Sequence, residues 1–244
     1  MNKKILKPIL ASTMTIALLA GCNGGGMPTV NNADGTPNRT QTGAIIGGLL
    51  GAVVGGTTAN HGGKRVVIGG ALGAAVGAAI GYSLDQQAAE VAQVLNTNVD
   101  NNPNAEQNVN NDLIVSNTDK YVKIMFRDDM MFATNSSTPT ASAQAKISQL
   151  TPVLQKYPNT IIQTVGHTDS RGSFQHNQTL SEARASSVGS TVKSSGIQNP
   201  IYSKGCSFSK PIAQNTSDMN MGLNRRVEVY LYPNQESVID PCRN

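Results

Sequence analysis

Residues 161–172 read IIQTVGHTDSRG, and this stretch decides how the C-terminal half of the chain folds. Residues 161–165 alternate between two faces, which predicts a β-strand. The polar residues that follow, up to Gly172, predict a turn at the end of that strand. A helical pattern then runs from about Asn177 to Gly196. We expect the turn to hold a ligand and the flanking elements to position it.

Similar patterns predict an α+β domain around this stretch. Alternating strands and helices favour a sheet that helices cover on one side. The expected elements are a hairpin over 113–126 that turns at 117–120, a helix that includes 143–154 and is kinked or ended by Pro152, a short strand over 201–204, and a last strand over 227–232 stopped by Pro233.

The charge of the chain is concentrated at its start. The formal net charge is +4, but Lys3, Lys4 and Lys7 lie in the extreme N-terminus. Without them the chain is close to neutral, so it lacks the basic surface that nucleic-acid binding requires. Nucleic acid is therefore excluded as a partner.

The N-terminus has the pattern of an export signal. Lysines precede an apolar run over 9–20, which is too short for a bilayer span of about 20 residues but suits a secretory signal. The run ends at Leu19-Ala20-Gly21-Cys22, which resembles the bacterial lipobox. Residues 1–21 are therefore expected to be a lipoprotein signal peptide and Cys22 to carry lipid; an ordinary signal peptide is the alternative. Asn23 favours the outer membrane by the same resemblance.

A flexible linker over 22–41 precedes a glycine repeat. Glycine recurs every fourth residue over 43–55 and again over 69–81, with a polar break at 60–65. This spacing places the glycines on one helix face, where close packing can offset their cost of about 1 kcal/mol each. Residues 42–95 therefore predict a helical hairpin with a helical extension. One interpretation is a hairpin that inserts into a membrane or oligomerises. The alternative is a soluble, tightly packed hairpin beside the membrane.

The Asn-rich residues 96–111 are expected to be a second linker, followed by a domain over 112–233 and a tail over 234–244. The domain carries three sets of residues that resemble the signature of the OmpA C-terminal domain family. They are Gly166-His167-Thr168-Asp169 with Gly172, Asn177, Leu180-Ser181 and Arg184-Ala185; Gly205 with Pro211-Ile212-Ala213 and Asn215; and Asn224-Arg225-Arg226-Val227. The whole arrangement is similar to YiaD-like outer-membrane lipoproteins.

This resemblance implies an OmpA-C-like βαβαβ mixed sheet with helices on one face, preceded by the glycine-zipper hairpin. It also implies non-covalent binding of peptidoglycan through the diaminopimelate of the stem peptide. That ligand presents an ammonium and a carboxylate on one carbon. Asp169 can accept from the ammonium, and Arg184 can grip the carboxylate with two nitrogens. The other expected contacts are Thr168 and the backbone amides after Asp169 as donors, Asn177 and Arg225 as supports of the loop, and Leu180 as an apolar wall.

Two other interpretations of these residues are weaker. Asp169 and Arg184 could form a purely structural ion pair, although exposed pairs contribute little stability. His167 could serve Ser181 in catalysis, but a packed or hydrogen-bonded histidine is the simpler interpretation. We find no activated nucleophile, no His/Cys spacing for a metal and no cofactor motif, so no catalytic residue and no cofactor are expected.

The three cysteines complete the prediction. With Cys22 acylated, Cys206 and Cys242 remain as an even pair in an oxidising compartment, and we expect a disulfide between them. Two free thiols are the alternative. The disulfide would tie down the tail, which could then cover part of the ligand site.

These features predict a non-enzymatic lipoprotein of the outer membrane that faces the periplasm and tethers the envelope to peptidoglycan. The alternative makes the glycine zipper the active part, as an oligomeric component of an envelope assembly or secretion machine. In that case the OmpA-like domain would be the stator that binds the wall.

Overall fold

The computed structural model describes residues 64–243, with side chains described from residue 78 onward. The signal peptide, Cys22, the linker over 22–41 and the first glycine array lie outside the described residues. The second glycine array lies on a helix, α2 (Lys64–Val94), that also includes the predicted extension. No helix in the described part of the chain has the length and apolar character needed to cross a membrane.

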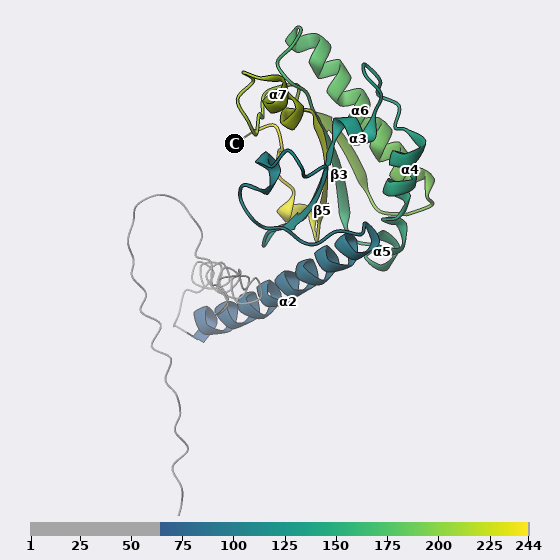
Figure 1. Ribbon diagram of the computed structural model, residues 1–244. Coiled ribbons are helices and arrows are strands. Elements are labelled where there is room, and N and C mark those ends of the chain that lie inside the picture. The colour runs from purple at the N-terminus through teal and green to yellow at the C-terminus, as the bar shows by residue number, and fades with distance from the viewer. Residues whose placement is uncertain (1–63, 244) are drawn as a thin grey trace, which may run out of the picture.

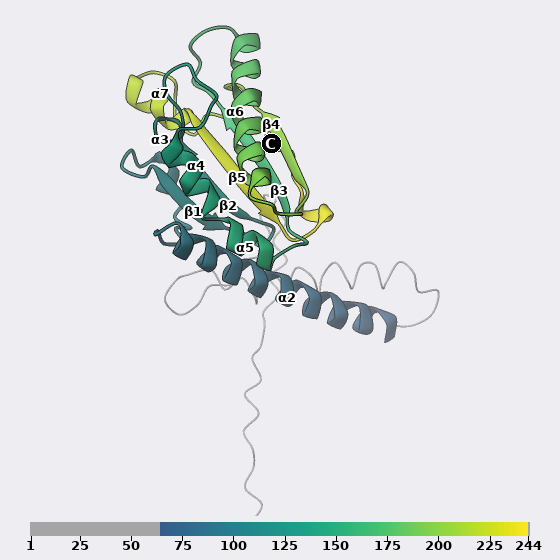
Figure 2. The ribbon, with the colours of Figure 1, turned by 90° about the vertical axis from the view of Figure 1, so that its right-hand side faces the viewer.

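The described residues form a five-stranded mixed sheet with helices on one face (Figures 1 and 2). Figure 2 views the sheet from the side of α4 and α6, and Figure 1 places the C-terminus on the opposite side. The strand order is β1-β2-β5-β3-β4. After α2 the elements are η1 (Ala105–Gln107), β1 (Leu113–Asn117), β2 (Val122–Arg127), α3 (Asp128–Met131), α4 (Ala141–Ser148), α5 (Thr151–Lys156), β3 (Ile161–His167), α6 (Phe174–Ser194), β4 (Ile201–Gly205), α7 (Asp218–Asn224), β5 (Arg226–Tyr232) and η2 (Gln235–Ser237).

The predicted strands are all present, but the strand over 161–165, around which the prediction is built, is not the middle strand of the sheet. Strand β3 pairs in parallel with β4 and antiparallel with β5, so β5 occupies the middle of the sheet and β3 lies one strand away. The last strand inserts between β2 and β3 because α6 carries the chain from β3 to a parallel neighbour on its outer side. Periodicity predicts that a strand exists, but not which strands it pairs with.

The helical predictions hold with shifted ends. The expected helix over 143–154 is two helices, α4 and α5, because Pro152 lies in the first turn of α5, where proline is tolerated. Helix α6 begins at Phe174 rather than near Asn177, since the Ser173 side chain accepts a hydrogen bond from the His176 amide and caps the helix. Gly196 follows its end with a φ of +83°.

The hydrophobic core reaches further toward the N-terminus than the predicted boundary at residue 112. The last turns of α2 pack against β1, β2 and α5 and belong to the same core cluster as the sheet. Five buried hydrophobic residues of this cluster lie on α2 or directly after it: Leu84, Ala88, Val91, Ala92 and Leu95. A fragment that starts at residue 112 would therefore expose part of this core.

Residues 96–111 are packed rather than a free spacer, which corrects the second predicted linker. Val99 forms a parallel bridge with Val115 of β1, and Ala105 is buried against Ile114 and Met125. Glu106 forms an ion pair with Lys123 of β2. The segment thus covers part of the sheet face opposite the long helices.

The same opposite face carries an aromatic cluster that the tail covers. The rings of Tyr230 and Tyr232 are stacked with centroids 5.8 Å apart, and Tyr121 meets both edge-on. Val238 and Ile239 of the tail pack against this cluster. The tail therefore belongs to the fold, on the side of the sheet away from α6.

Cys206 and Cys242 are joined by a disulfide that fixes the tail to the loop after β4. The Cys206 amide donates to the carbonyl of Gly166, and the Thr168 amide donates to the carbonyl of Ser207. The disulfide thus anchors the tail to the same backbone that supports the end of β3.

Replacing both cysteines with serine is expected to lower the free energy of unfolding by about 2–4 kcal/mol, since the bond closes a loop between residues 36 apart in sequence. Denaturant unfolding followed by circular dichroism measures the change. Reducing agent should bring the natural protein down to the stability of the Cys206→Ser, Cys242→Ser variant and leave that variant unaffected. Equal stability of the variant and the oxidised protein would contradict this expectation.

Candidate functional site

The predicted site residues meet at one cavity of about 830 Å³ at the end of β3. Its walls come from α3 and the loop after it, from the loop after β3, from α6 and from Arg225. All six predicted ligand residues line it: Thr168, Asp169, Asn177, Leu180, Arg184 and Arg225. Of the described tail residues 234–243, none lines the cavity, so this part of the tail leaves it open.

Asp169 is buried at the floor of this cavity and held by two arginines. One oxygen, Oδ2, accepts from Arg171 Nη2 at 2.7 Å and from Arg225 Nη1 at 3.0 Å, while Oδ1 accepts from the Arg171 amide at 3.0 Å. Burial favours a raised pKa, but these hydrogen bonds outweigh it and hold the pKa of Asp169 below its usual value. Asp169 is therefore a carboxylate at neutral pH.

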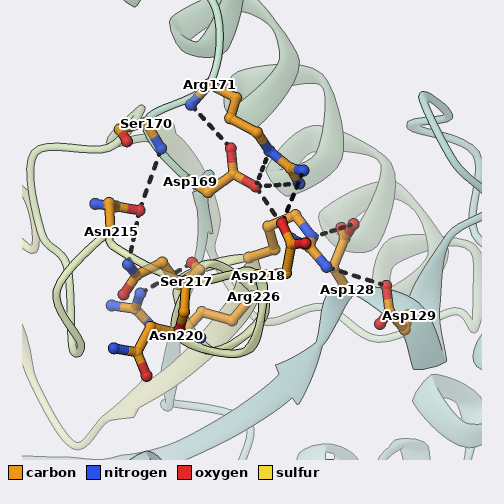
Figure 3. A network of polar contacts seen from close by, with 12 residues as sticks. Asp128, Asp129, Asp169, Ser170, Arg171, Asn215, Ser217, Asp218, Asn220 and Arg226 are labelled. Atoms are coloured by element: carbon orange, nitrogen blue, oxygen red, sulfur yellow. Dashed lines mark hydrogen bonds and ion pairs between the residues drawn. The ribbon is translucent and has the colours of Figure 1, made fainter.

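Arg171 covers Asp169 from the solvent side (Figure 3). Its side chain is 58% exposed, and its second ion pair, to Asp218, is long at 3.6 Å. The pair with Asp218 is exposed on both sides and contributes at most about 1 kcal/mol. Because its own side chain is largely exposed, Arg171 can move into solvent when another cation takes its place at Asp169.

Arg184 projects from α6 into the other side of the cavity and is only 3% exposed. Its Nε donates to the carbonyl of Ser136 at 3.0 Å, and its guanidinium lies 5.0 Å from the centre of the Phe132 ring. Its Nη1 lies 2.9 Å from Asp128 Oδ1. Among the described residues, Arg184 and Asp169 thus form ion pairs with other residues, which argues against the structural pair between them. Because α6 starts earlier than expected, Arg184 lies nearly three turns into the helix rather than two.

The supporting residues have separate roles. Asn177 Nδ2 donates to the Arg171 carbonyl at 2.8 Å and fixes the loop, which turns at Gly172 with a φ of +89°. Thr168 Oγ1 is buried at the cavity and has no hydrogen-bond partner among the described residues. Leu180 forms a half-buried apolar wall.

The backbone amides after Asp169 are not free to bind a ligand, contrary to the sequence-based expectation. The Ser170 amide donates to Asn215 Oδ1 at 3.2 Å, and the Arg171 amide donates to Asp169 itself. Asn215 in turn accepts from Asn224, whose side chain is fully buried (Figure 3 shows Asn215 beside Ser170). These amides stabilise the loop instead.

Sequence analysis missed two carboxylates and an arginine in the cavity. Asp128 and Asp129 lie on α3 directly after β2, and Arg171 lies two residues after Asp169. A pair of acidic residues that follows a buried strand is a visible signal. It could not be assigned to this site without knowing that α3 lies beside α6.

The catalytic interpretation of His167 fails on geometry. His167 is buried on the other face of the sheet, where its Nε2 lies 3.3 Å from Glu228 Oε2. Burial and the nearby Arg226 lower its pKa. Ser181 instead donates to the Gln178 carbonyl and accepts from the Ser207 amide. The prediction of a packed, hydrogen-bonded histidine is confirmed.

Comparison with known families assigns this part of the chain. Residues 131–225, which hold most of the cavity wall, match the family model described as OmpA family. Residues 1–85 match the model of the YMGG-like Gly-zipper. Both matches agree with the motifs of the sequence, a glycine repeat in the N-terminal part and an OmpA-like signature in the C-terminal part.

The chain is also similar to individual proteins. The chain is 28% identical over 198 residues to the probable lipoprotein YiaD of Escherichia coli, a match that covers 80% of this chain and 84% of YiaD. It is 35% identical over 108 residues to outer membrane protein A of Bordetella avium, covering 44% of this chain and 56% of that protein. Among solved structures, the cell wall anchor of the T6SS from Pseudomonas aeruginosa aligns with a TM-score of 0.46 and 24% identity, over 53% of this chain and 94% of that one.

Proposed function

We propose that this protein binds peptidoglycan without turnover, through the diaminopimelate of the stem peptide, and tethers the outer membrane to the cell wall. The binding site is the cavity at the end of β3. The membrane end is the lipid on Cys22.

One observation carries this proposal: a buried carboxylate and a buried guanidinium, Asp169 and Arg184, line the same cavity. A free amino acid head has an ammonium and a carboxylate on one carbon. A site that binds it therefore needs an anion for the ammonium and a cation for the carboxylate. Charge-assisted hydrogen bonds in a buried site are among the strongest polar contacts in proteins. The OmpA-family match covers both residues.

The ligand ammonium replaces Arg171 at Asp169. Arg171 is the exposed partner of Asp169, so it can leave while Arg225 keeps its contact. The ligand carboxylate binds Arg184. Thr168 Oγ1, buried and unpartnered among the described residues, donates to or accepts from the ligand, and Leu180 packs against its aliphatic chain.

The envelope location rests on the N-terminal part of the chain. Leu19-Ala20-Gly21-Cys22 has the lipobox pattern, and the similar YiaD carries the name probable lipoprotein. A lipid-anchored protein with a wall-binding domain on its far end faces the periplasm. The alternative, in which an oligomeric glycine zipper is the active part of a larger machine, stays a prediction because the first glycine array lies outside the described residues.

The test is co-sedimentation of the full-length, detergent-extracted protein with diaminopimelate-type peptidoglycan. Asp169→Ala and Arg184→Ala are each expected to weaken binding by at least about tenfold, since each removes a charged hydrogen bond worth about 1.5–3 kcal/mol. A thermal melt of each variant verifies that it is folded.

Two charge-matched changes outside the cavity are the controls. Asp119→Asn alters the turn between β1 and β2, and Arg243→Gln alters the tail, where the side chain is 86% exposed. Both should sediment like the natural protein. Undiminished sedimentation of both cavity variants would overturn the proposed mechanism.

A further inference from the structure

The cavity already contains a carboxylate at the position that the ligand carboxylate requires. Asp128, on α3, places Oδ1 2.9 Å from Nη1 of Arg184. Both residues are almost fully buried, with 6% of Asp128 and 3% of Arg184 exposed. Arg171, the partner of Asp169, is exposed and can move into solvent. Asp128, the partner of Arg184, is enclosed by the protein and cannot.

Asp128 is nevertheless poorly satisfied. Its Oδ1 has no well-aligned hydrogen-bond donor among the described residues, despite the short distance to Arg184. Its Oδ2 lies 4.0 Å from Arg225 Nε, which is a weak contact. A buried carboxylate needs aligned donors to offset the loss of water. The contact between Asp128 and Arg184 is therefore one that a better ligand for Arg184 can replace.

We propose that Asp128 is an internal competitor for Arg184, so that the ligand carboxylate binds fully only when Asp128 takes up a proton. This inference rests on the proposed function, because it describes how the same cavity is regulated. Two carboxylates cannot both stay ionised at one guanidinium without strong repulsion, and protonation of the buried one removes that repulsion.

The charges around Asp128 agree with this assignment. Arg184 faces it from α6, and Arg225 follows α7. Asp129 is its neighbour on α3 (Figure 3), and Asp129 Oδ1 lies 3.8 Å from Arg225 Nη2. Burial raises the pKa of Asp128 to about 6, and the two arginines offset only part of this effect. A second carboxylate at Arg184 raises this pKa further. Ligand binding therefore takes up protons above about pH 6, and affinity falls as the pH rises from there.

The experiment measures binding of a soluble stem tripeptide that ends in diaminopimelate, by calorimetry with the detergent-extracted full-length protein. For the natural protein, affinity is expected to fall by at least about fivefold between about pH 6 and about pH 7.5, with proton uptake seen as a difference between buffers of unlike ionisation enthalpy. Asp128→Asn should bind at least about fivefold more tightly at the higher pH and lose most of the pH dependence.

Asp129→Asn separates competition at Arg184 from a general change in charge. It removes a neighbouring carboxylate, whose side chain is 86% exposed and which contacts Arg225 instead. An equal gain in affinity from Asp129→Asn would overturn the proposal, as would weaker or unchanged binding by Asp128→Asn.

The pH profile of the natural protein decides the question even if Asp128→Asn fails to fold. A flat profile with no proton uptake overturns the inference and leaves the proposed function standing. Absence of binding at every pH, in the natural protein and in Asp128→Asn, overturns the proposed function and the inference with it.

Discussion

Replacing Glu228 with glutamine is expected to destabilise the sheet domain by about 3–5 kcal/mol, because it leaves a buried arginine without its counter-ion. Glu228 is 3% exposed; it accepts from Arg226 Nε at 2.8 Å and from the Tyr230 hydroxyl at 2.8 Å. Arg226 is equally buried and donates to the backbone carbonyls of Asn224 and Lys210. Urea unfolding of the natural and variant proteins measures the loss.

The pH dependence of this effect has a definite sign. Burial alone would raise the pKa of Glu228, but Arg226 and His167 outweigh it and hold the pKa well below 4.5. The stabilisation is therefore present above about pH 4.5 and is lost as the pH falls through the lower pKa of the folded state. The unfolding free energies of the two proteins should converge in acid.

A matched change and a double variant complete this test. Glu182→Gln alters an exposed glutamate on α6 and should stay within about 0.5 kcal/mol of the natural protein. Adding Arg226→Met to Glu228→Gln removes both charges and should recover part of the loss. If Glu228→Gln is as stable as Glu182→Gln, the buried ion pair does not have the role assigned to it.

Replacing Gly166 with alanine is expected to cost more than about 3 kcal/mol or to prevent folding, since overpacking against rigid backbone is severe. A Cβ at this position would lie 2.1 Å from the carbonyl oxygen of Ser181 on α6. Neither β3 nor α6 can move away without disturbing Thr168 and Asp169, which lie two and three residues after Gly166. Soluble yield and thermal unfolding measure the effect.

Gly222→Ala is the matched control. Gly222 lies within α7, and its added Cβ would be 3.6 Å from Arg225 Nη2, an ordinary contact distance. Alanine is favoured over glycine in a helix by about 1 kcal/mol, so this variant should be as stable as the natural protein or slightly more stable. Similar stability of the two glycine variants would contradict the close approach of α6 to β3.

Much of the fold could be predicted because each element has a local signal. The strand over 161–165, the end of α6 at Gly196 and the break near Pro152 follow from periodicity and backbone chemistry, whereas the cap of α6 at Ser173 was not predicted. The position of β5 between β2 and β3 has no such signal, since strand pairing depends on contacts between distant parts of the chain.

The ordered structure of residues 96–111 could not be predicted, for a different reason. The segment has few apolar residues, which normally indicates a linker. Its structure comes instead from side chains that accept hydrogen bonds from nearby amides, as Asp100 does from Asn102, Asn102 from Asn104, and Asn108 from Asn110. Asn and Asp side chains can replace backbone partners in this way, so an Asn-rich segment can be rigid.

At the site, the sequence placed Asp169 and Arg184 at one cavity but not the residues that pair with them. Arg171 is local to Asp169 and could have been considered from spacing alone. Asp128 lies 56 positions before Arg184, and their contact depends on the packing of α3 beside α6. Such a partner becomes visible only in three dimensions.

Helix α2 has a mechanical consequence. It runs without interruption from Lys64 to Val94, about 46 Å at 1.5 Å per residue, and its last turns are locked into the core through Leu84 and Val91. The second glycine array and the sheet domain are therefore joined by one continuous helix. A pull or a twist applied at the start of α2 acts directly on the hydrophobic core, and packing in this domain resists it.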